Sequence, residues 1–166
     1  MRKFLGLVGA VALLAACSTA QTDGSNANAS GDSSATASKL GPAAGTAQDF
    51  VVNVGDRVFF GYDQYNISAD ARSTLEKQAA WLKKFPKGTV ALEGHADERG
   101  TREYNLALAE RRANAAKEYL VSLGVDAMRI KVISYGKERP VALGHNEAAW
   151  AQNRRAVTVV SMGAGS

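Results

Sequence analysis

The residues best suited to chemistry lie in one stretch, residues 94–112, which has the sequence GHADERGTREYNLALAERR. Acidic and basic side chains gather there in a polar loop that leads into a helix, and such loops often hold functional sites. Asp97 and Arg112 make the most informative pair. A carboxylate accepts hydrogen bonds from an ammonium group, and a guanidinium grips a carboxylate with two parallel bonds. Together they could bind a zwitterion that carries an amine and a carboxylate on one carbon.

Helical spacing places further residues beside this pair. Asn105, Leu108 and Arg112 are separated by three and four residues and therefore share a helix face. We expect Arg112 to point toward the loop that contains Asp97, with a small pocket between the loop and the helix. The aromatic loop 60–65 follows a neighbouring strand and could form one wall of that pocket.

The same spacing allows a simpler interpretation. Asp97 and Arg112 could form a plain salt bridge that positions the loop and binds no ligand. The chain would then be a protein-interaction module, and the charged loop would serve its fold alone. Spacing leaves both interpretations open.

Two enzymatic or metal-dependent alternatives are weaker. His95 and His145 could ligate a metal together with Asp97, but no third ligand is closely spaced, so we predict no metal site and no cofactor. Glu98 and the neighbouring acids could form the carboxylate pair of a glycoside hydrolase. Such a pair needs one raised pKa, whereas the surrounding arginines favour ionised acids. We therefore expect a binding protein and not an enzyme.

The first residues have the features of an export signal. Residues 1–16 carry Arg2 and Lys3, then a short apolar run, then small residues. The run is shorter than the roughly 20 apolar residues that a membrane-spanning helix needs. Loss of this segment would lower the net charge from +4 to +2. So mild a basicity gives little reason to expect nucleic acid as a partner.

The motif LAAC at the end of the leader resembles a bacterial lipobox. The resemblance implies cleavage before Cys17, the single cysteine, which becomes the lipidated N-terminus. Ser18 follows in place of the aspartate that retains many such lipoproteins in the inner membrane. The implied location is the outer membrane, lipid-anchored, with the domain facing the periplasm.

Composition divides the rest of the chain into two parts. Residues 17–48, the lipidated N-terminus and tether, are dominated by small and polar residues and should be disordered. Residues 49–166 have the hydrophobic periodicity of a folded domain. There Ser68 and Thr101 are expected N-caps of two helices, and Leu106 is an expected core residue of the second. The predicted strands are 56–60, 89–93, 129–134 and 156–160, and a short helix is predicted at 146–152.

Helices of this length between strands are typical of parallel crossover units. We therefore predict an α/β fold, in which helices cover one face of a sheet and leave the other more open.

Several spaced motifs resemble the OmpA-like peptidoglycan-binding domain. Their order along the chain matches that family. The matching segments are GHADERG at 94–100, YN at 104–105, Leu108, RRANA at 111–115 and NRRAV at 153–157.

Two more segments resemble one branch of that family, the peptidoglycan-associated lipoproteins. They are SYGKERP at 134–140 and GHNEAA at 144–149. The implied fold is an OmpA-like two-layer sandwich, a mixed β-sheet covered by helices on one face.

The resemblance also implies residue roles. The family binds peptidoglycan non-covalently through the diaminopimelate of the stem peptide. By motif, Asp97 receives the ammonium of the ligand and Arg112 grips its carboxylate. Asn105 and Leu108 line the helix side, and Arg154 supports the site.

The backbone of four residues after the first strand completes the implied pocket. These are Phe60, Gly61, Tyr62 and Asp63. Many family members have aspartate where Gly61 stands, so any role of that carboxylate is absent here, although a backbone N–H would serve equally well.

The implied function is to tether the outer membrane to the cell wall as part of the Tol-Pal system, in cell division and envelope integrity. The implied partners are peptidoglycan, TolB and other Tol proteins, and the outer membrane through the lipid anchor at Cys17. The alternative is a lipid-anchored protein-interaction module with no direct peptidoglycan binding.

Overall fold

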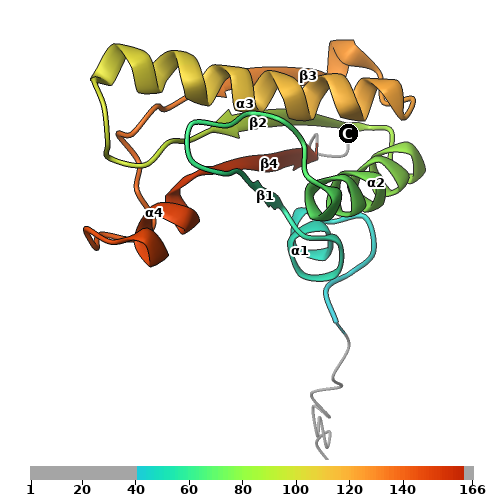
Figure 1. Ribbon diagram of the computed structural model, residues 1–166. Helices are drawn as coiled ribbons and strands as arrows, with labels where there is room; N and C mark the ends of the chain where they lie inside the picture. The colour runs from blue at the N-terminus through green and yellow to red at the C-terminus, as the bar shows by residue number, and fades with distance from the viewer. Residues whose placement is uncertain (1–40, 163–166) are drawn as a thin grey trace, which may run out of the picture. The chain divides into compact units, whose positions relative to one another are not determined.

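A computed structural model describes residues 41–162 of the chain (Figure 1). The predicted signal peptide 1–16, the lipidation site Cys17 and most of the predicted tether lie outside the described residues. The elements, in chain order, are α1 (Ala47–Asp49), η1 (Phe50–Val54), β1 (Arg57–Phe59), α2 (Ala69–Lys84), β2 (Gly88–Gly94), α3 (Arg102–Ser122), η2 (Ala127–Arg129), β3 (Ile130–Ser134), α4 (Glu147–Asn153) and β4 (Arg155–Met162).

The four strands form one mixed sheet in the order β1-β4-β2-β3. β2 pairs in parallel with β3, whereas β4 runs antiparallel to both of its neighbours, β1 and β2. The predicted α/β fold and mixed sheet are thus confirmed. The crossover from β1 through α2 to β2 differs from the simplest parallel unit, because β4 lies between these two strands. Only the β2–α3–β3 unit joins strands that are paired in parallel.

Local sequence explains where the two long helices begin. The side chain of Ser68 accepts a hydrogen bond from the backbone N–H of Ala71, and the side chain of Thr101 does the same for Tyr104. Both are N-caps, which satisfy backbone donors that the first helical turn leaves free. The predicted helix starts are therefore confirmed.

The helices α2 and α3 cover one face of the sheet (Figure 1). Their apolar side chains meet those of β1, β2, β3 and β4 in one core. One prediction was wrong: Leu106 is 43% exposed, while Leu108 is buried. The buried side of α3 runs through Leu108, Ala109 and Arg112, and Leu106 lies just beyond its edge.

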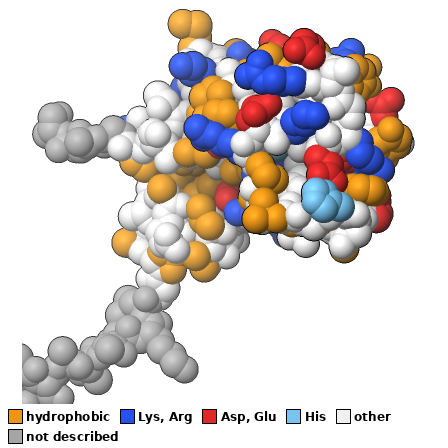
Figure 2. Space-filling model, turned by 90° about the vertical axis from the view of Figure 1, so that its left-hand side faces the viewer, with side chains coloured by type: hydrophobic (Ala, Val, Ile, Leu, Met, Phe, Trp, Pro, Cys, Tyr) orange, Lys and Arg blue, Asp and Glu red, His pale blue; other side chains and the backbone are white. Residues whose placement is uncertain are grey.

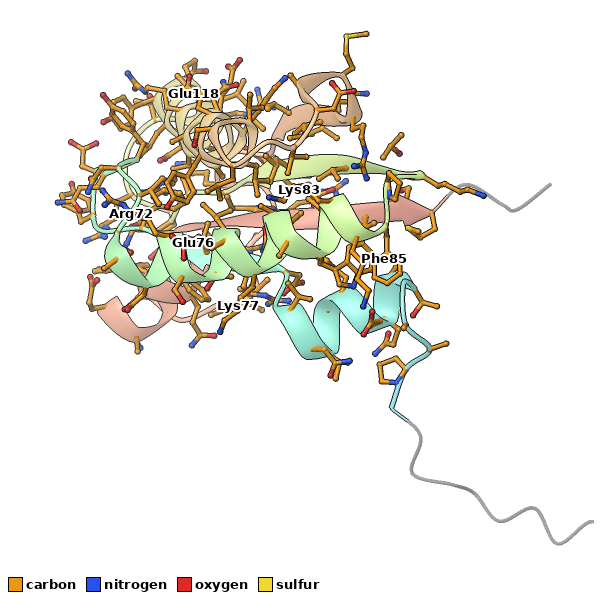
Figure 3. All side chains as sticks on the ribbon, turned by 90° about the vertical axis from the view of Figure 1, so that its right-hand side faces the viewer. Arg72, Glu76, Lys77, Lys83, Phe85 and Glu118 are labelled. Atoms are coloured by element: carbon orange, nitrogen blue, oxygen red, sulfur yellow. The ribbon has the colours of Figure 1, made fainter. Side chains whose placement is uncertain are left out.

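Polar contacts join α2 to α3 at the surface. Arg72, Glu76 and Lys77 project from the outer side of α2 (Figure 3). Glu76 accepts a hydrogen bond from the Tyr119 hydroxyl of α3 at 3.0 Å. The two helices therefore share a charged rim above the apolar core.

The segment before β1 contains two short helices that the sequence patterns did not predict. Thr46 caps α1, and the buried Asp49 carboxylate accepts 2.8 Å hydrogen bonds from the Trp81 indole and the Asn53 amide. The Phe50 ring packs edge-on against Trp81, with centroids 5.0 Å apart. The predicted domain boundary at residues 48/49 falls inside α1. From residue 41 to residue 162, no helix combines the length and hydrophobicity needed to cross a membrane.

Gly94 permits the closest approach between the two layers. A Cβ atom at this position would lie 1.9 Å from the carbonyl oxygen of Ala109 on α3. Because this oxygen belongs to the helix backbone, the clash can be relieved only by moving α3 away from β2.

We predict that Gly94→Ala lowers the free energy of unfolding by about 3 kcal/mol, as overpacking of a rigid interior does. Urea denaturation measures the change. Gly41→Ala is the matched control, since a Cβ there meets nothing within 4 Å. A Gly94→Ala protein as stable as the control would show that the two layers can separate at little cost.

Candidate functional site

A pocket of about 180 Å³ opens where the loops after β1 and β2 meet the start of α3. Six of the predicted site residues line it, and three further residues complete its wall. The lining residues are Tyr62, Asp63, Asp97, Arg99, Gly100, Tyr104, Asn105, Leu108 and Arg112.

The other three predicted residues lie behind this lining. Phe60 is buried, and its backbone carbonyl accepts a 3.0 Å hydrogen bond from the Arg154 guanidinium. The carbonyl of Gly61 accepts one from Arg112 at 3.1 Å. All nine predicted residues are thus brought to one place, with Phe60, Gly61 and Arg154 supporting the pocket from behind.

The guanidinium of Arg112 is fully buried at the base of the pocket. It donates hydrogen bonds to the backbone carbonyls of Gln64 at 2.8 Å, His95 at 2.9 Å and Gly61 at 3.1 Å. Burial lowers the pKa of Arg112 to about 10, so the group is still a cation at neutral pH. Within residues 41–162, no carboxylate oxygen lies within 4.0 Å of it. The simple Asp97–Arg112 salt bridge is therefore not formed.

Asp97 is paired with two other arginines. Its carboxylate receives a 2.6 Å contact from Arg99 and a 3.4 Å contact from Arg154. Burial alone would raise the pKa of Asp97, but the hydrogen bonds and charges of Arg99, with a further hydrogen bond from Arg154, outweigh it and lower the pKa. Asp97 is therefore an ionised carboxylate that faces the pocket.

Arg154 holds the pieces of the site together. Beyond its contact with Asp97, it donates to the Phe60 carbonyl and to Glu147 of α4, the latter at 2.6 Å. Its side chain is 7% exposed. One guanidinium thus connects the end of β1, the loop after β2 and α4.

The sequence patterns missed three of the lining residues, Arg99, Gly100 and Tyr104. Arg99 is the one that contacts Asp97. Its guanidinium lies 4.1 Å from the ring centroid of Tyr62 and 4.0 Å from that of Trp150. Cations are attracted to aromatic faces at such distances. Only its position two residues after Asp97 hinted at this role, since Trp150 is far away in the sequence.

The two histidines have different surroundings. His95 is buried behind the pocket, where it stacks on Tyr135 with ring centroids 5.5 Å apart. His145 is exposed and lies 2.7 Å from a carboxylate oxygen of Glu98. Among the residues that the structure describes, no group of three or more metal-binding side chains is close enough together to hold a metal ion.

The surface around the pocket is charged but balanced in sign. Figure 2 shows the end of the molecule that carries α4, where basic and acidic side chains alternate. Within the pocket the Arg112 cation lies at the base, and the Asp97 anion lies on the wall beside Arg99. Such an arrangement complements a zwitterion better than it complements a simple anion or cation.

Comparison with known proteins identifies the family. The OmpA family model matches residues 59–154, which span the sheet, the pocket and the supporting loops. The chain belongs to the OmpA family, in its peptidoglycan-associated lipoprotein branch. The peptidoglycan-associated lipoprotein of Mesorhizobium japonicum is 61% identical over 122 residues, which is 74% of this chain and 72% of that protein.

Other members of the branch extend the similarity. The peptidoglycan-associated lipoprotein of Haemophilus influenzae is 44% identical over 162 residues, covering 93% of this chain and 95% of that protein. The crystal structure of the Burkholderia pseudomallei peptidoglycan-associated lipoprotein superimposes with a TM-score of 0.63 at 45% identity. That match covers 64% of this chain and 90% of the other. These similarities support the predicted OmpA-like fold.

Because His95 is buried, we predict that the folded domain loses stability in acid. Burial and the nearby charges of Arg155 and Arg139 lower its pKa from 6.5 to about 4. Between these values the unfolded chain binds a proton that the folded chain does not, so the free energy of unfolding falls as the pH falls from 6.5 toward 4. We expect this group to contribute roughly 2–3 kcal/mol to the fall.

Urea denaturation of the wild type and of His95→Gln at pH 7, 6, 5 and 4.5 measures this contribution. The variant should lose part of the pH dependence, whereas His145→Gln, which changes the exposed histidine, should keep it. Parallel pH profiles for the wild type and His95→Gln would contradict the prediction.

Proposed function

We propose that this chain binds peptidoglycan non-covalently, through the diaminopimelate residue of the stem peptide. The observation that carries the proposal is the buried guanidinium of Arg112, which has no carboxylate partner within the described part of the chain. An unpaired buried charge is costly, and a ligand carboxylate would compensate for it. The relatives are named peptidoglycan-associated lipoproteins, and this name refers to the same polymer.

The geometry of Arg112 suits a carboxylate. A guanidinium has five N–H donors, and Arg112 uses three of them on backbone carbonyls. The remaining two can donate to a carboxylate that enters the pocket. Because the three carbonyls fix the side chain, little conformational freedom is lost when the ligand binds.

The second charge of the ligand goes to Asp97. Diaminopimelate ends in one carbon that carries both an ammonium and a carboxylate, so it can satisfy Asp97 and Arg112 together. A lysine side chain has the amine and lacks the carboxylate. Leu108 and Tyr104 offer apolar surface to the methylene chain of the ligand, and Asn105 helps to hold the loop by donating to the Arg99 carbonyl at 2.8 Å.

We further propose that the protein is anchored in the outer membrane by lipid at Cys17, with the domain in the periplasm. The support is the lipobox-like motif and the Haemophilus influenzae relative, whose similarity covers 93% of this chain. Anchored in this way, a peptidoglycan-binding domain tethers the outer membrane to the cell wall. Participation in the Tol-Pal system, with TolB and other Tol proteins as partners, in cell division and envelope integrity, rests on family resemblance.

A binding role also fits the chemistry better than an enzymatic one. Asp97 lies on the pocket wall, and its lowered pKa makes it unsuited to act as a general acid at neutral pH. The alternative of a protein-interaction module depended on a structural Asp97–Arg112 bridge. The two side chains have different partners, which removes the main argument for that alternative.

Retention on isolated cell walls tests the proposal. We predict that the full chain in detergent sediments with diaminopimelate-type sacculi and is retained at least tenfold less by lysine-type sacculi. Arg112→Gln should lose retention by a similar factor, because the ligand carboxylate loses its partner. Arg111→Gln is the matched control, since Arg111 is the exposed neighbour on the same helix.

The comparison of the two wall types needs no variant, so it remains decisive if Arg112→Gln fails to fold. Equal retention by both wall types would contradict diaminopimelate recognition. Loss of retention in Arg111→Gln as well would point to general charge attraction.

A further inference from the structure

The carboxylate of Asp97 is already saturated with donors. One oxygen accepts from the backbone N–H of Arg99 at 3.1 Å and from the Arg99 Nε at 3.2 Å. The other accepts from Arg99 at 2.6 Å and from Arg154 at 3.4 Å. A carboxylate has about four lone-pair positions. An ammonium group that approaches Asp97 therefore has to displace one of these donors.

The guanidinium of Arg154 cannot readily move away from Asp97. Its side chain is 7% exposed and is also bonded to the Phe60 carbonyl and to Glu147. Moving it would break contacts that join β1 to α4. Removing a buried group from such a network is strongly destabilising.

The guanidinium of Arg99 can move more easily. Its side chain is 29% exposed, and outside Asp97 it contacts two aromatic faces and one carboxylate oxygen of Glu147 at 3.8 Å. Tyr62 is 62% exposed, and the Glu147 side chain is 63% exposed. Glu147 is thus a second carboxylate within 4 Å of the Arg99 guanidinium.

We propose that Arg99 is an internal competitor for the ammonium position of the site. Its guanidinium occupies Asp97 in the absence of ligand and moves toward Glu147 when a ligand ammonium binds. The proposal rests on the proposed function, because it concerns the same pocket. It adds a residue that sets the affinity of the site.

The consequence for binding follows from the two charges of the ligand. Every ligand ammonium has to displace a guanidinium that holds Asp97 through two nitrogens, so Arg99 weakens a lone amine and a zwitterion by the same factor. The lone amine gains nothing from Arg112, whereas the zwitterion gains the Arg112 contact and remains bound. Arg99 thus sets how tightly the site binds, and Arg112 sets which ligand it prefers.

A nuclear magnetic resonance titration of the full chain in detergent tests the proposal, with meso-diaminopimelate and Nα-acetyl-lysine amide as probes, because the second carries only the side-chain amine. We expect Arg99→Gln to bind meso-diaminopimelate three- to tenfold more tightly than the wild type does, because partly exposed ion pairs are weak competitors. The lysine probe should gain by the same factor, because both ligands displace the same guanidinium, and the ratio of the two affinities should therefore stay unchanged. The Trp150 indole signal should shift when ligand binds to the wild type.

Arg102→Gln is the matched control. Arg102 is an exposed arginine three residues further along, paired with Glu138 at 3.1 Å and outside the pocket lining. This substitution removes the same charge near the site without freeing Asp97, and its affinity should equal that of the wild type. A comparable gain in Arg102→Gln would assign the effect to overall charge and overturn the proposal.

Equal or weaker binding in Arg99→Gln would also overturn it, because Arg99 would then contact the ligand or position Asp97. That result differs from failure of the proposed function, in which neither the wild type nor Arg99→Gln would bind meso-diaminopimelate at all. In that case both proposals would fall. The amide spectrum of each variant establishes that its fold is intact.

Discussion

The structure depends on one buried cation, the guanidinium of Arg112. Three backbone carbonyls hold it, and they belong to two loops that are far apart in the sequence, after β1 and after β2. The guanidinium therefore brings both loops onto α3 and shapes the base of the pocket. The close packing of Gly94 against Ala109 keeps the helix near enough for these contacts. The hydrogen bonds of Arg112 go to neutral carbonyl oxygens, so no carboxylate of the described chain neutralises its charge.

A second layer of contacts controls the acidic side of the pocket. Asp97 is held by Arg154, which is fixed, and by Arg99, which is more exposed. The two charges of the site thus differ before a ligand binds. The Arg112 cation has no carboxylate partner in the described chain, whereas the Asp97 anion is already paired with two arginines. The proposed ligand would use both charges, because it carries an ammonium and a carboxylate on one carbon.

Much of this architecture could be predicted from local sequence. The caps Ser68 and Thr101 satisfy nearby backbone donors, so their signals lie within a few residues. The structure brings the nine predicted site residues to one place, on the loops after β1 and β2, on α3 and just before β4. The insertion of β4 between β1 and β2 was beyond local patterns, because strand order depends on packing over the whole sheet. Local patterns did not pair Asp97 with Arg154 either, because Arg154 lies 57 residues away in the chain and entered the predicted site only through the family resemblance.

The measurement that tests the central claim most directly is calorimetric titration of the full chain in detergent with two stem peptides. One contains diaminopimelate, and the other contains lysine in its place. If Arg112 awaits a ligand carboxylate, the first peptide should bind and the second should bind at least tenfold more weakly. Equal affinity for the two peptides would contradict that role, and binding to neither would mean that the buried cation serves the fold alone.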